Sequence, residues 1–288
     1  MQIIEHETEI KSRSEHLTLV PLGDTHLGTK NCDEELFQRE IDFIKRNPNT
    51  YWVFMGDACE FINISDPRWD TNVAEWIHVE NLNNLVKVQA DKFLEYVYPI
   101  HHKCMGVLEG NHEEKVRSRY HFSPTDYIAM ELGVPNLSNV CMIRWRILRK
   151  SMGTNKQPAM RNIVIYANHG SGGGRFIGGK INKLIQTCIG FDADIYLMGH
   201  VHEKLVHEIP RLQIYGYGEN MRLIHHTRYF ILTGTFLKAY QQNSRSYAEP
   251  KMYNPTSLGA MHIKIKPFPN VRINGQKVDL PPEIHISQ

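Results

Sequence analysis

The chain has 288 residues, of which 41% are hydrophobic and 22% are charged, a composition typical of a soluble globular protein and not of a disordered one. Lys and Arg number 33 and Asp and Glu 31, so the net charge of +2 excludes binding to nucleic acid through overall charge alone. No run of about 18 apolar residues and no secretory signal pattern is present, which argues against a membrane helix and against export. Five scattered cysteines argue against a disulfide framework, and we therefore expect a cytoplasmic protein.

Short apolar segments alternate with amphipathic segments over most of the chain, which predicts an α/β fold class. Strands are expected over residues 17–22, 51–55, 103–108, 141–147, 162–167 and 194–198. Helices are expected after the capping residue Asp33, over residues 82–97, after Ser123-Pro124 and around residues 181–188. Residues 63–76 follow no regular pattern, and we expect them to run over the surface.

The helical pattern fades beyond residue 204. Four short segments there, 205–209, 212–217, 221–225 and 229–233, have the pattern of a strand meander, and residues 262–265 indicate one more strand. We expect one domain over residues 1–266 and a proline-bearing tail, 267–288, packed on its surface.

Residue types that bind metals follow five of the expected strands, each within two or three positions of the strand end. In chain order they are Asp24 and His26, Asp57, Asn111 and His112, His169, and then His200 and His202. Because the carboxyl ends of strands line the ligand crevice of open α/β sheets, these side chains can converge on one point. Side chains two positions apart at a strand end point the same way, which suits the Asp-x-His and His-x-His pairs.

Carboxylate oxygens, an amide oxygen and imidazole nitrogens form a mixed ligand set, which suits divalent transition metals better than Ca²⁺. Mn²⁺ is the ion that we expect, and Fe²⁺, Zn²⁺, Ni²⁺ and Co²⁺ suit the same ligands. Two metals about 3.5–4 Å apart, bridged by one carboxylate, would use all of these ligands. A lone histidine at a strand end is usually a structural residue, but five such sites in one chain favour a metal centre.

Five motifs occur in the order found in one protein family, namely Gly23-Asp24-Thr25-His26, Gly56-Asp57, Gly110-Asn111-His112-Glu113, Asn168-His169-Gly170 and Gly199-His200-Val201-His202. On these motifs, over roughly residues 17–235, the chain resembles the calcineurin-like metallophosphoesterases. That superfamily includes Mre11/SbcD-type nucleases, cyclic-nucleotide phosphodiesterases and purple acid phosphatases. The resemblance implies two mixed β-sheets packed as a sandwich and flanked by helices, with a dinuclear metal site at the rim formed by the carboxyl ends of the strands. Residues 1–266 would be a single catalytic domain.

Carried over residue by residue, the resemblance assigns Asp24, His26 and His202 to the first metal and Asn111, His169 and His200 to the second. Asp57 would bridge the two metals, and His112 would be the catalytic histidine beside the scissile phosphate. The third motif ends in Glu113, where the family often has aspartate, and Glu60 follows the second motif. Neither position holds a metal ligand in the family, so we expect both glutamates to orient neighbouring ligands.

The implied reaction is metal-dependent phosphoester hydrolysis. Two divalent ions would lower the pKa of a bound water to about 7, and the resulting bridging hydroxide would attack phosphorus in line while His112 assists the leaving group. We favour a phosphodiesterase or nuclease, because basic residues such as Arg117 follow His112 and suit a polyanion. The alternatives are a phosphomonoesterase or nucleotide pyrophosphohydrolase, and a non-catalytic metal-binding scaffold.

Residues expected to contact the substrate are Asn111, His112, Gly172, Arg175, Lys180 and Arg117. Residues 174–180 fit the G-x-x-x-x-G-K pattern of a phosphate-binding loop, but Ile181 stands where that loop needs Ser or Thr. Arg175 and Lys180 still lie near an expected helix N-terminus, which favours phosphate. We therefore expect a phosphoester substrate, such as a nucleic acid or nucleotide, and no membrane partner, while the oligomeric state stays open.

Overall fold

The fold is built from two sheets, and each takes strands from both halves of the chain. The structure, a computed structural model, describes residues 1–288 except 63, 67, 68, 70, 151–158, 173, 175, 216, 219, 220, 243, 245–247, 274, 275 and 288, and only the backbone of residues 215, 271–273 and 276–279. In these residues the six-stranded sheet has the order β1 (Gln2–Ile10), β5 (Val140–Arg149), β6 (Ala159–Asn168), β7 (Ile195–Met198), β9 (Arg222–Thr233) and β8 (Lys204–Tyr215). The five-stranded sheet has the order β13 (Glu283–Ser287), β10 (His262–Lys266), β2 (Leu17–Leu22), β3 (Thr50–Phe54) and β4 (Cys104–Val107), and β11 (Asn270–Ile273) pairs with β12 (Gln276–Asp279).

Both sheets are mixed. In the six-stranded sheet β1 runs parallel to β5, β6 to β7 and β7 to β9, whereas the pairs β5–β6 and β8–β9 are antiparallel. In the five-stranded sheet β2, β3 and β4 run parallel, and β10 is antiparallel to β2 and β13. The expected α/β class with two mixed sheets is therefore confirmed.

The sheets pack face to face on a shared apolar core. Leu19 of β2 and Val53 of β3 belong to the same buried cluster as Ile143 of β5 and Ile165 of β6. This alignment of two inner faces is the expected sandwich.

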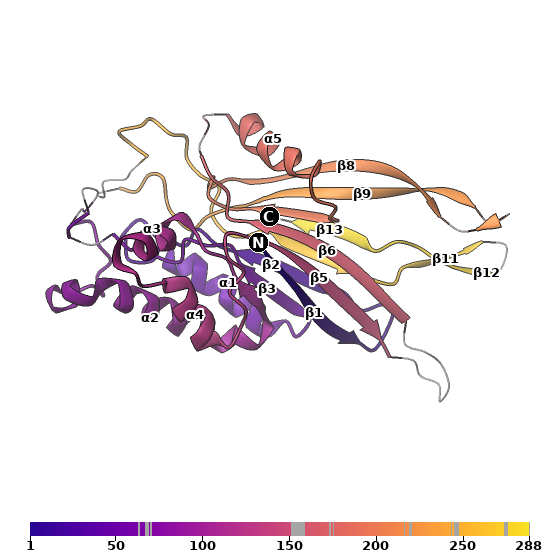
Figure 1. Ribbon diagram of the computed structural model, residues 1–288, viewed down its shortest axis with the longest axis horizontal. Helices are drawn as coiled ribbons and strands as arrows, with labels where there is room; N and C mark the ends of the chain where they lie inside the picture. The colour runs from indigo at the N-terminus through magenta and orange to yellow at the C-terminus, as the bar shows by residue number, and fades with distance from the viewer. Residues whose placement is uncertain are drawn as a thin grey trace.

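Helices cover both outer faces of the sandwich. They are α1 (Glu34–Arg46), α2 (Leu85–Val97), α3 (Asn111–Tyr120), α4 (Pro124–Leu132) and α5 (Ile177–Thr187), with 3₁₀ turns at η1 (Val79–Asn84) and η2 (Tyr98–Lys103). Apolar side chains of α1, α2 and α4 pack on the five-stranded sheet, and those of α5 pack on the six-stranded sheet. Figure 1 shows α5 and the other helices on opposite sides of the paired sheets.

The helix ends follow from local chemistry that the sequence already indicates. The Asp33 carboxylate accepts the N–H of Leu36 at 3.0 Å at the start of α1. Ser123 Oγ accepts the N–H of Asp126 at 3.1 Å at the start of α4, and Gly133, with φ of 66°, ends that helix.

Two elements have no apolar pattern that predicts them. The outward face of β1 carries Glu5 and Glu9, which form ion pairs with Arg146 at 2.8 Å and Lys150 at 2.5 Å. Only the last part of β1 is buried, so its sequence is mostly polar and has no apolar pattern of a strand. Helix α3 is mostly polar for the same reason, since its outer side faces solvent.

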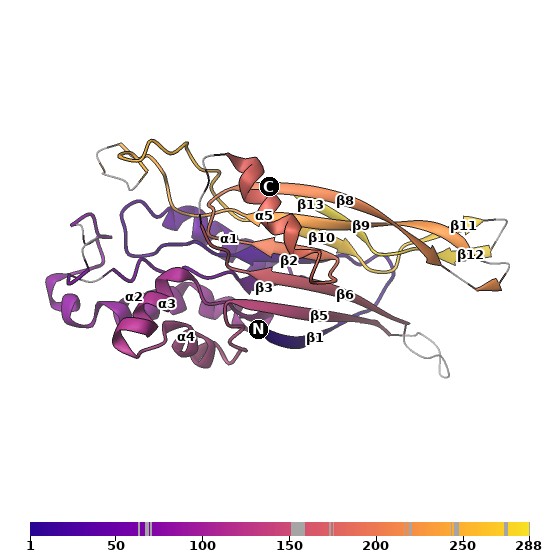
Figure 2. The same ribbon diagram turned by 45° about the horizontal axis from the view of Figure 1, so that its top comes forward.

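The expected meander of four short strands is wrong. Two long strands, β8 and β9, take the place of the four, and they pair from Lys204 opposite Thr233 to Tyr215 opposite Arg222. Pro210 lies within β8 and does not end it, because β8 is an edge strand and a missing N–H on its free side breaks no sheet hydrogen bond. The far end of this hairpin reaches away from α2 and α3 (Figure 2).

The segment after residue 266 contributes to the second sheet. Strand β13 pairs with β10 from Ser287 opposite His262 to Glu283 opposite Lys266. A domain boundary at residue 266 stays a prediction. None of the helices in the described part of the chain has the length and apolar character needed to cross a membrane.

Candidate metal centre

The polar residues that follow five strands come together where the ends of the two sheets meet. From the five-stranded sheet, Asp24 and His26 follow β2, Asp57 follows β3, and Asn111 and His112 follow β4 as the first residues of α3. From the six-stranded sheet, His169 follows β6, and His200 and His202 follow β7. The centre therefore depends on the packing of one sheet against the other.

Main-chain hydrogen bonds fix the first two loops against each other. The N–H of Asp24 donates to the carbonyl of Gly56 at 2.9 Å, and the N–H of Thr25 donates to the carbonyl of Asp57 at 3.0 Å. Gly56 has φ of 95°, and a Cβ there would lie 2.7 Å from Nδ1 of His169. Only glycine satisfies both conditions, which explains the Gly-Asp order of this motif.

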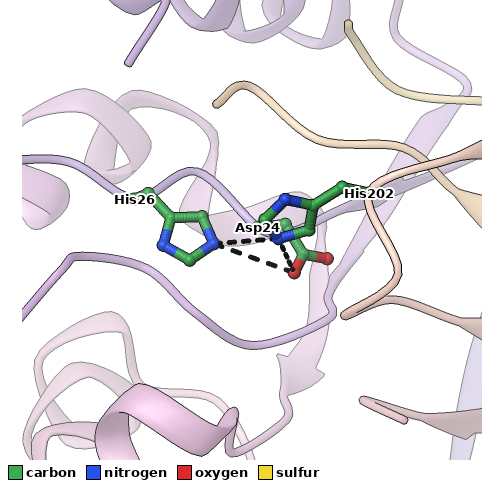
Figure 3. A group of neighbouring side chains, drawn as sticks. All are labelled: Asp24, His26 and His202. Atoms are coloured by element: carbon green, nitrogen blue, oxygen red, sulfur yellow. Dashed lines mark hydrogen bonds and ion pairs between the residues drawn. The ribbon is translucent and has the colours of Figure 1, made fainter. Parts of the chain in front are cut away.

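Asp24, His26 and His202 form a first cluster (Figure 3). Nε2 of His202 lies 3.1 Å from Nε2 of His26 and 3.2 Å from Oδ1 of Asp24, and Nε2 of His26 lies 4.0 Å from the same oxygen. Ligand atoms about 2.0–2.2 Å from one metal are roughly 3 to 3.6 Å apart, so this cluster has nearly the size of a coordination shell. All three residues offer an oxygen or nitrogen to the same point.

Asp57, His169 and His200 form a second cluster. Nε2 of His169 lies 3.3 Å from Oδ2 of Asp57 and 3.2 Å from Oδ1 of Asn111. Oδ2 of Asp57 also lies 3.9 Å from Nε2 of His26, which belongs to the first cluster. One carboxylate oxygen thus faces both clusters.

Hydrogen bonds on the outer side of the ligands set their orientation. Nδ1 of His169 lies 2.7 Å from the carbonyl of Met55, and since a carbonyl only accepts, Nδ1 carries the proton and Nε2 faces the cluster. The carboxylate of Asp24 accepts the N–H of His200 at 2.9 Å, which links the loops after β2 and β7.

Glu60 supports two histidines at once. Its carbonyl lies 2.6 Å from Nδ1 of His112, and its Oε1 lies 3.1 Å from Nδ1 of His26. Glu60, His26 and His112 also form a third group of possible ligands. The expectation that Glu60 orients its neighbours agrees with this geometry.

Glu113 holds the main chain that carries Asp57. Its carboxylate is buried and accepts three N–H groups, those of Asp57 at 3.1 Å, Ala58 at 2.7 Å and Gly110 at 3.0 Å. The loops after β3 and β4 are therefore bonded to one side chain, which is the orienting role expected from the sequence.

Five of the candidate ligands have a left-handed backbone conformation. The φ angles are 47° at Asp24, 50° at His26, 55° at Asp57, 64° at His200 and 54° at His202. Such angles cost a residue with a side chain about 1–2 kcal/mol each and are tolerated best by Asn, Asp and His. Strain concentrated on one constellation is typical of a functional site.

Burial and neighbouring charges shift the pKa values of the ligands. Burial alone would raise the pKa of Asp57, but the imidazoles of His169 and His112 lower it well below its ordinary value. Burial would lower the pKa of His169, but the Asp57 carboxylate raises it to about 10. Burial and the charge of His169 together lower the pKa of His200 to about 4. Buried carboxylates and crowded imidazoles of this kind would be stabilised by a divalent cation, and the O/N donor set fits the transition metals expected above.

The residues expected to contact substrate are less closely grouped. Lys180 donates to the carbonyl of Val201 at 3.2 Å and to Oε1 of Glu203 at 3.0 Å, so it holds the loop that carries His200 and His202. Gly172, with φ of 75°, lies exposed on the loop after His169.

Arg117 has an acidic partner of its own. Its Nε and Nη2 donate to the two carboxylate oxygens of the buried Glu109 at 2.6 and 3.2 Å. Arg175 lies outside the described residues. The side chains of Asn111 and His112 lie at the centre itself, as described above.

No family model and no curated protein matches the sequence. Among solved structures, the chain is similar to a predicted phosphoesterase from Streptococcus pneumoniae, at 12% identity over 95% of this chain and 99% of that chain, with a TM-score of 0.33. It is also similar to Vps29 complexed with Zn²⁺ from Entamoeba histolytica, at 13% identity over 94% and 98%, with a TM-score of 0.35. A metallophosphoesterase from Sphaerobacter thermophilus is 13% identical over 94% and 89%, with a TM-score of 0.34. These similarities are too distant to assign a function, which therefore rests on the geometry of the centre.

Proposed function

We propose that this protein is a calcineurin-like metallophosphoesterase, a hydrolase that uses two divalent cations to cleave a phosphoester. The observation that carries the proposal is the position of Asp57. Its Oδ2 faces Nε2 of His26 at 3.9 Å on one side and Nε2 of His169 at 3.3 Å on the other. A carboxylate between two mixed O/N clusters is the arrangement that a two-metal phosphoesterase requires.

The ligands divide between the two positions as the motifs indicate. Asp24, His26 and His202 would hold one cation, Asn111, His169 and His200 the other, and Asp57 both. Mn²⁺ is our choice of ion, since imidazole and carboxylate ligands together accept it. Two such ions, when bound, polarise the phosphoester and supply an acidic water for in-line attack.

His112 is placed to handle a proton. Its Nδ1 is occupied by the carbonyl of Glu60, so Nε2 is the atom that can donate to a leaving oxygen. Burial would lower the pKa of His112, but the carboxylates of Asp57 and Glu60 raise it above its ordinary value. This raised pKa favours the protonated form of His112, which is the form that a general acid requires.

The kind of ester is a separate question. The preference for a phosphodiester or a nucleic acid came from basic residues near His112, but Arg117 is paired with Glu109 and Lys180 with Glu203. Less cationic charge is left for a polyanion, so a phosphomonoesterase or nucleotide pyrophosphohydrolase is an equal candidate. The complete ligand set and His112 count against a non-catalytic scaffold. We also propose a cytoplasmic location, in keeping with five free cysteines.

Two substitutions test the proposal with Mn²⁺-loaded protein, using bis-p-nitrophenyl phosphate and p-nitrophenyl phosphate. His112→Asn should keep the metals, counted by elemental analysis, and lower turnover by about 10²–10⁴-fold. Asp57→Ala should lose both metals. The ratio of the two turnover rates separates a diesterase from a monoesterase.

His102→Asn, at an exposed position on η2, is the matched control and should change neither metal content nor turnover. Full turnover in His112→Asn, or two metals retained in Asp57→Ala, would contradict the proposal.

A further inference from the structure

The residues that line one polar surface cavity are connected to two of the candidate metal ligands. The volume of the cavity is about 420 Å³, which is in the range of small-molecule sites. Residues of four segments line it: the end of the loop after β4, helix α3, the start of α4, and the segment between α4 and β5. Gln2, at the start of β1, completes the rim.

Two of the residues that line this cavity are next to candidate metal ligands, one along the chain and one through a hydrogen bond. Glu109 lies two residues before Asn111, a stretch of chain that spans at most about 7 Å. The carbonyl of Asn139, which also lines the cavity, accepts the N–H of His169 at 3.3 Å. The N–H of Glu109 donates to the carbonyl of Ser138 at 3.0 Å, so both walls are joined. Residues of the cavity lining are therefore directly connected to Asn111 through the chain and to His169 through a main-chain hydrogen bond.

The charges of the lining do not suit a second phosphate. The Arg117 guanidinium is bonded through two atoms to Glu109, whose side chain is 7% exposed, so the positive charge is neutralised. Asp126 adds a further carboxylate, and no second cation balances it among the lining residues that the structure describes. The net negative charge of the lining would repel an anion, whereas it would not repel an uncharged group.

The other lining side chains are amides and hydroxyls. Asn136 is held in place, since its Nδ2 donates to Oδ1 of Asp126 at 2.6 Å and its Oδ1 accepts the N–H of Ser138 at 2.8 Å. The described residues that line the cavity are all polar, so none of them offers an aromatic face on which a base could stack. Donors and acceptors on a preorganised wall match a ligand that is itself rich in hydroxyl groups.

We infer that this cavity binds an uncharged, hydroxylated alcohol group, that of a sugar or polyol, whose phosphoester is held at the metal centre. The inference rests on the proposed function and narrows its substrate class. Asn139 and Gln2 are the residues whose side chains can be removed with least disturbance, because both are exposed and their main-chain contacts do not depend on the side chain.

The test compares a hydroxylated substrate with one that lacks hydroxyls. The measured quantity is kcat/KM for glucose 6-phosphate divided by kcat/KM for p-nitrophenyl phosphate, in Mn²⁺-loaded protein. Asn139→Ala and Gln2→Ala should each lower this ratio about 3- to 10-fold, the loss expected for one hydrogen bond. Asn162→Ala, on the exposed part of β6 and about 20 Å along the strand from Asn168, is the matched control and should leave the ratio unchanged.

A binding measurement separates failure of this inference from failure of the proposed function. Glucose 6-phosphate is titrated calorimetrically into Mn²⁺-loaded His112→Asn protein, with and without Asn139→Ala. Weaker binding in the double variant supports the cavity even if the wild-type protein turns over no ester. The protein could hydrolyse p-nitrophenyl phosphate while the variants leave both the kcat/KM ratio and the affinity for glucose 6-phosphate unchanged. That result would overturn the inference about the cavity and leave the hydrolase proposal intact.

Discussion

The main-chain N–H of Asp57 donates a hydrogen bond to the side-chain carboxylate of Glu113. Oε2 of Glu113 accepts the Asp57 N–H at 3.1 Å, while the same carboxylate also accepts the N–H groups of Ala58 and Gly110. The residue that faces both ligand clusters is thus positioned by a carboxylate 56 positions away in the sequence.

Replacing Glu113 by glutamine should destabilise the protein. A carboxylate accepts on both oxygens, but an amide has one acceptor and one donor, so at least one buried N–H of the three loses its partner. We expect Glu113→Gln to lower the free energy of unfolding by about 1–3 kcal/mol, measured by urea titration. Glu114→Gln, at the exposed neighbouring position, should change it by less than about 0.5 kcal/mol. Equal stability of the two variants would show that the three bonds contribute nothing.

Replacing Glu60 by glutamine separates its two contacts. The carbonyl that orients His112 is unchanged, but the negative charge beside Nδ1 of His26 is lost. We expect Glu60→Gln to weaken Mn²⁺ binding about 10- to 100-fold, as removal of such an orienting carboxylate usually does. The pKa of His112 should also fall, because Glu60 is one of the groups that raise it, so the alkaline limb of the pH–rate profile should move to lower pH.

Glu80→Gln, on the exposed turn η1, is the control for the loss of one charge. Metal affinity and pH profile that match the control would mean that Glu60 has no orienting role.

The pKa of His169 predicts how metal binding depends on pH. Asp57 raises this pKa from 6.5 to about 10, so their ion pair stabilises the metal-free protein below pH about 6.5, and this contribution is lost as the pH rises through about 10. A cation must displace the proton from Nε2 to bind there. Its apparent affinity should therefore rise with pH between these limits, by up to about tenfold per unit for each proton displaced.

Calorimetric titration with Mn²⁺ in two buffers of different ionisation enthalpy measures the number of protons released. At least one proton per chain should be released at pH 7.5. A heat of binding that is the same in both buffers would rule out a protonated His169.

Replacement of glycine by alanine should have opposite effects on stability at two positions. A Cβ on Gly110 would overlap Oδ1 and the main-chain N of Asp57 and lie 2.6 Å from Oε2 of Glu113. Gly110→Ala should therefore destabilise the protein by about 3 kcal/mol and weaken metal binding. An added Cβ on Gly178, in α5, would meet open space beyond its own helix in the part of the chain that the structure describes, so Gly178→Ala should stabilise the helix by about 0.5–1 kcal/mol. Thermal unfolding of the two variants checks both signs, and a stable Gly110→Ala protein with normal metal content would refute the first.

Much of the local structure can be predicted from the sequence, because it depends on near neighbours. Apolar runs predict β2 and β3, and helical spacing with Asp33 as the cap predicts α1. The elements that were missed depend on partners. Strand β1 has few apolar residues. Its glutamates fit a strand because they form ion pairs with Arg146 and Lys150, which are distant in the sequence.

The candidate ligands could be named from the sequence because chemistry-bearing residues follow five strands in a known order of motifs. Their arrangement could not, since it requires the two sheets to pack. Only the tertiary structure shows that one oxygen of Asp57 faces both clusters and that Arg117 is neutralised by Glu109. It alone shows that the carbonyls of Met55 and Glu60 orient His169 and His112. Every residue has the same carbonyl group, so no residue type signals such a role, and a distance between remote segments exists only after the chain has folded.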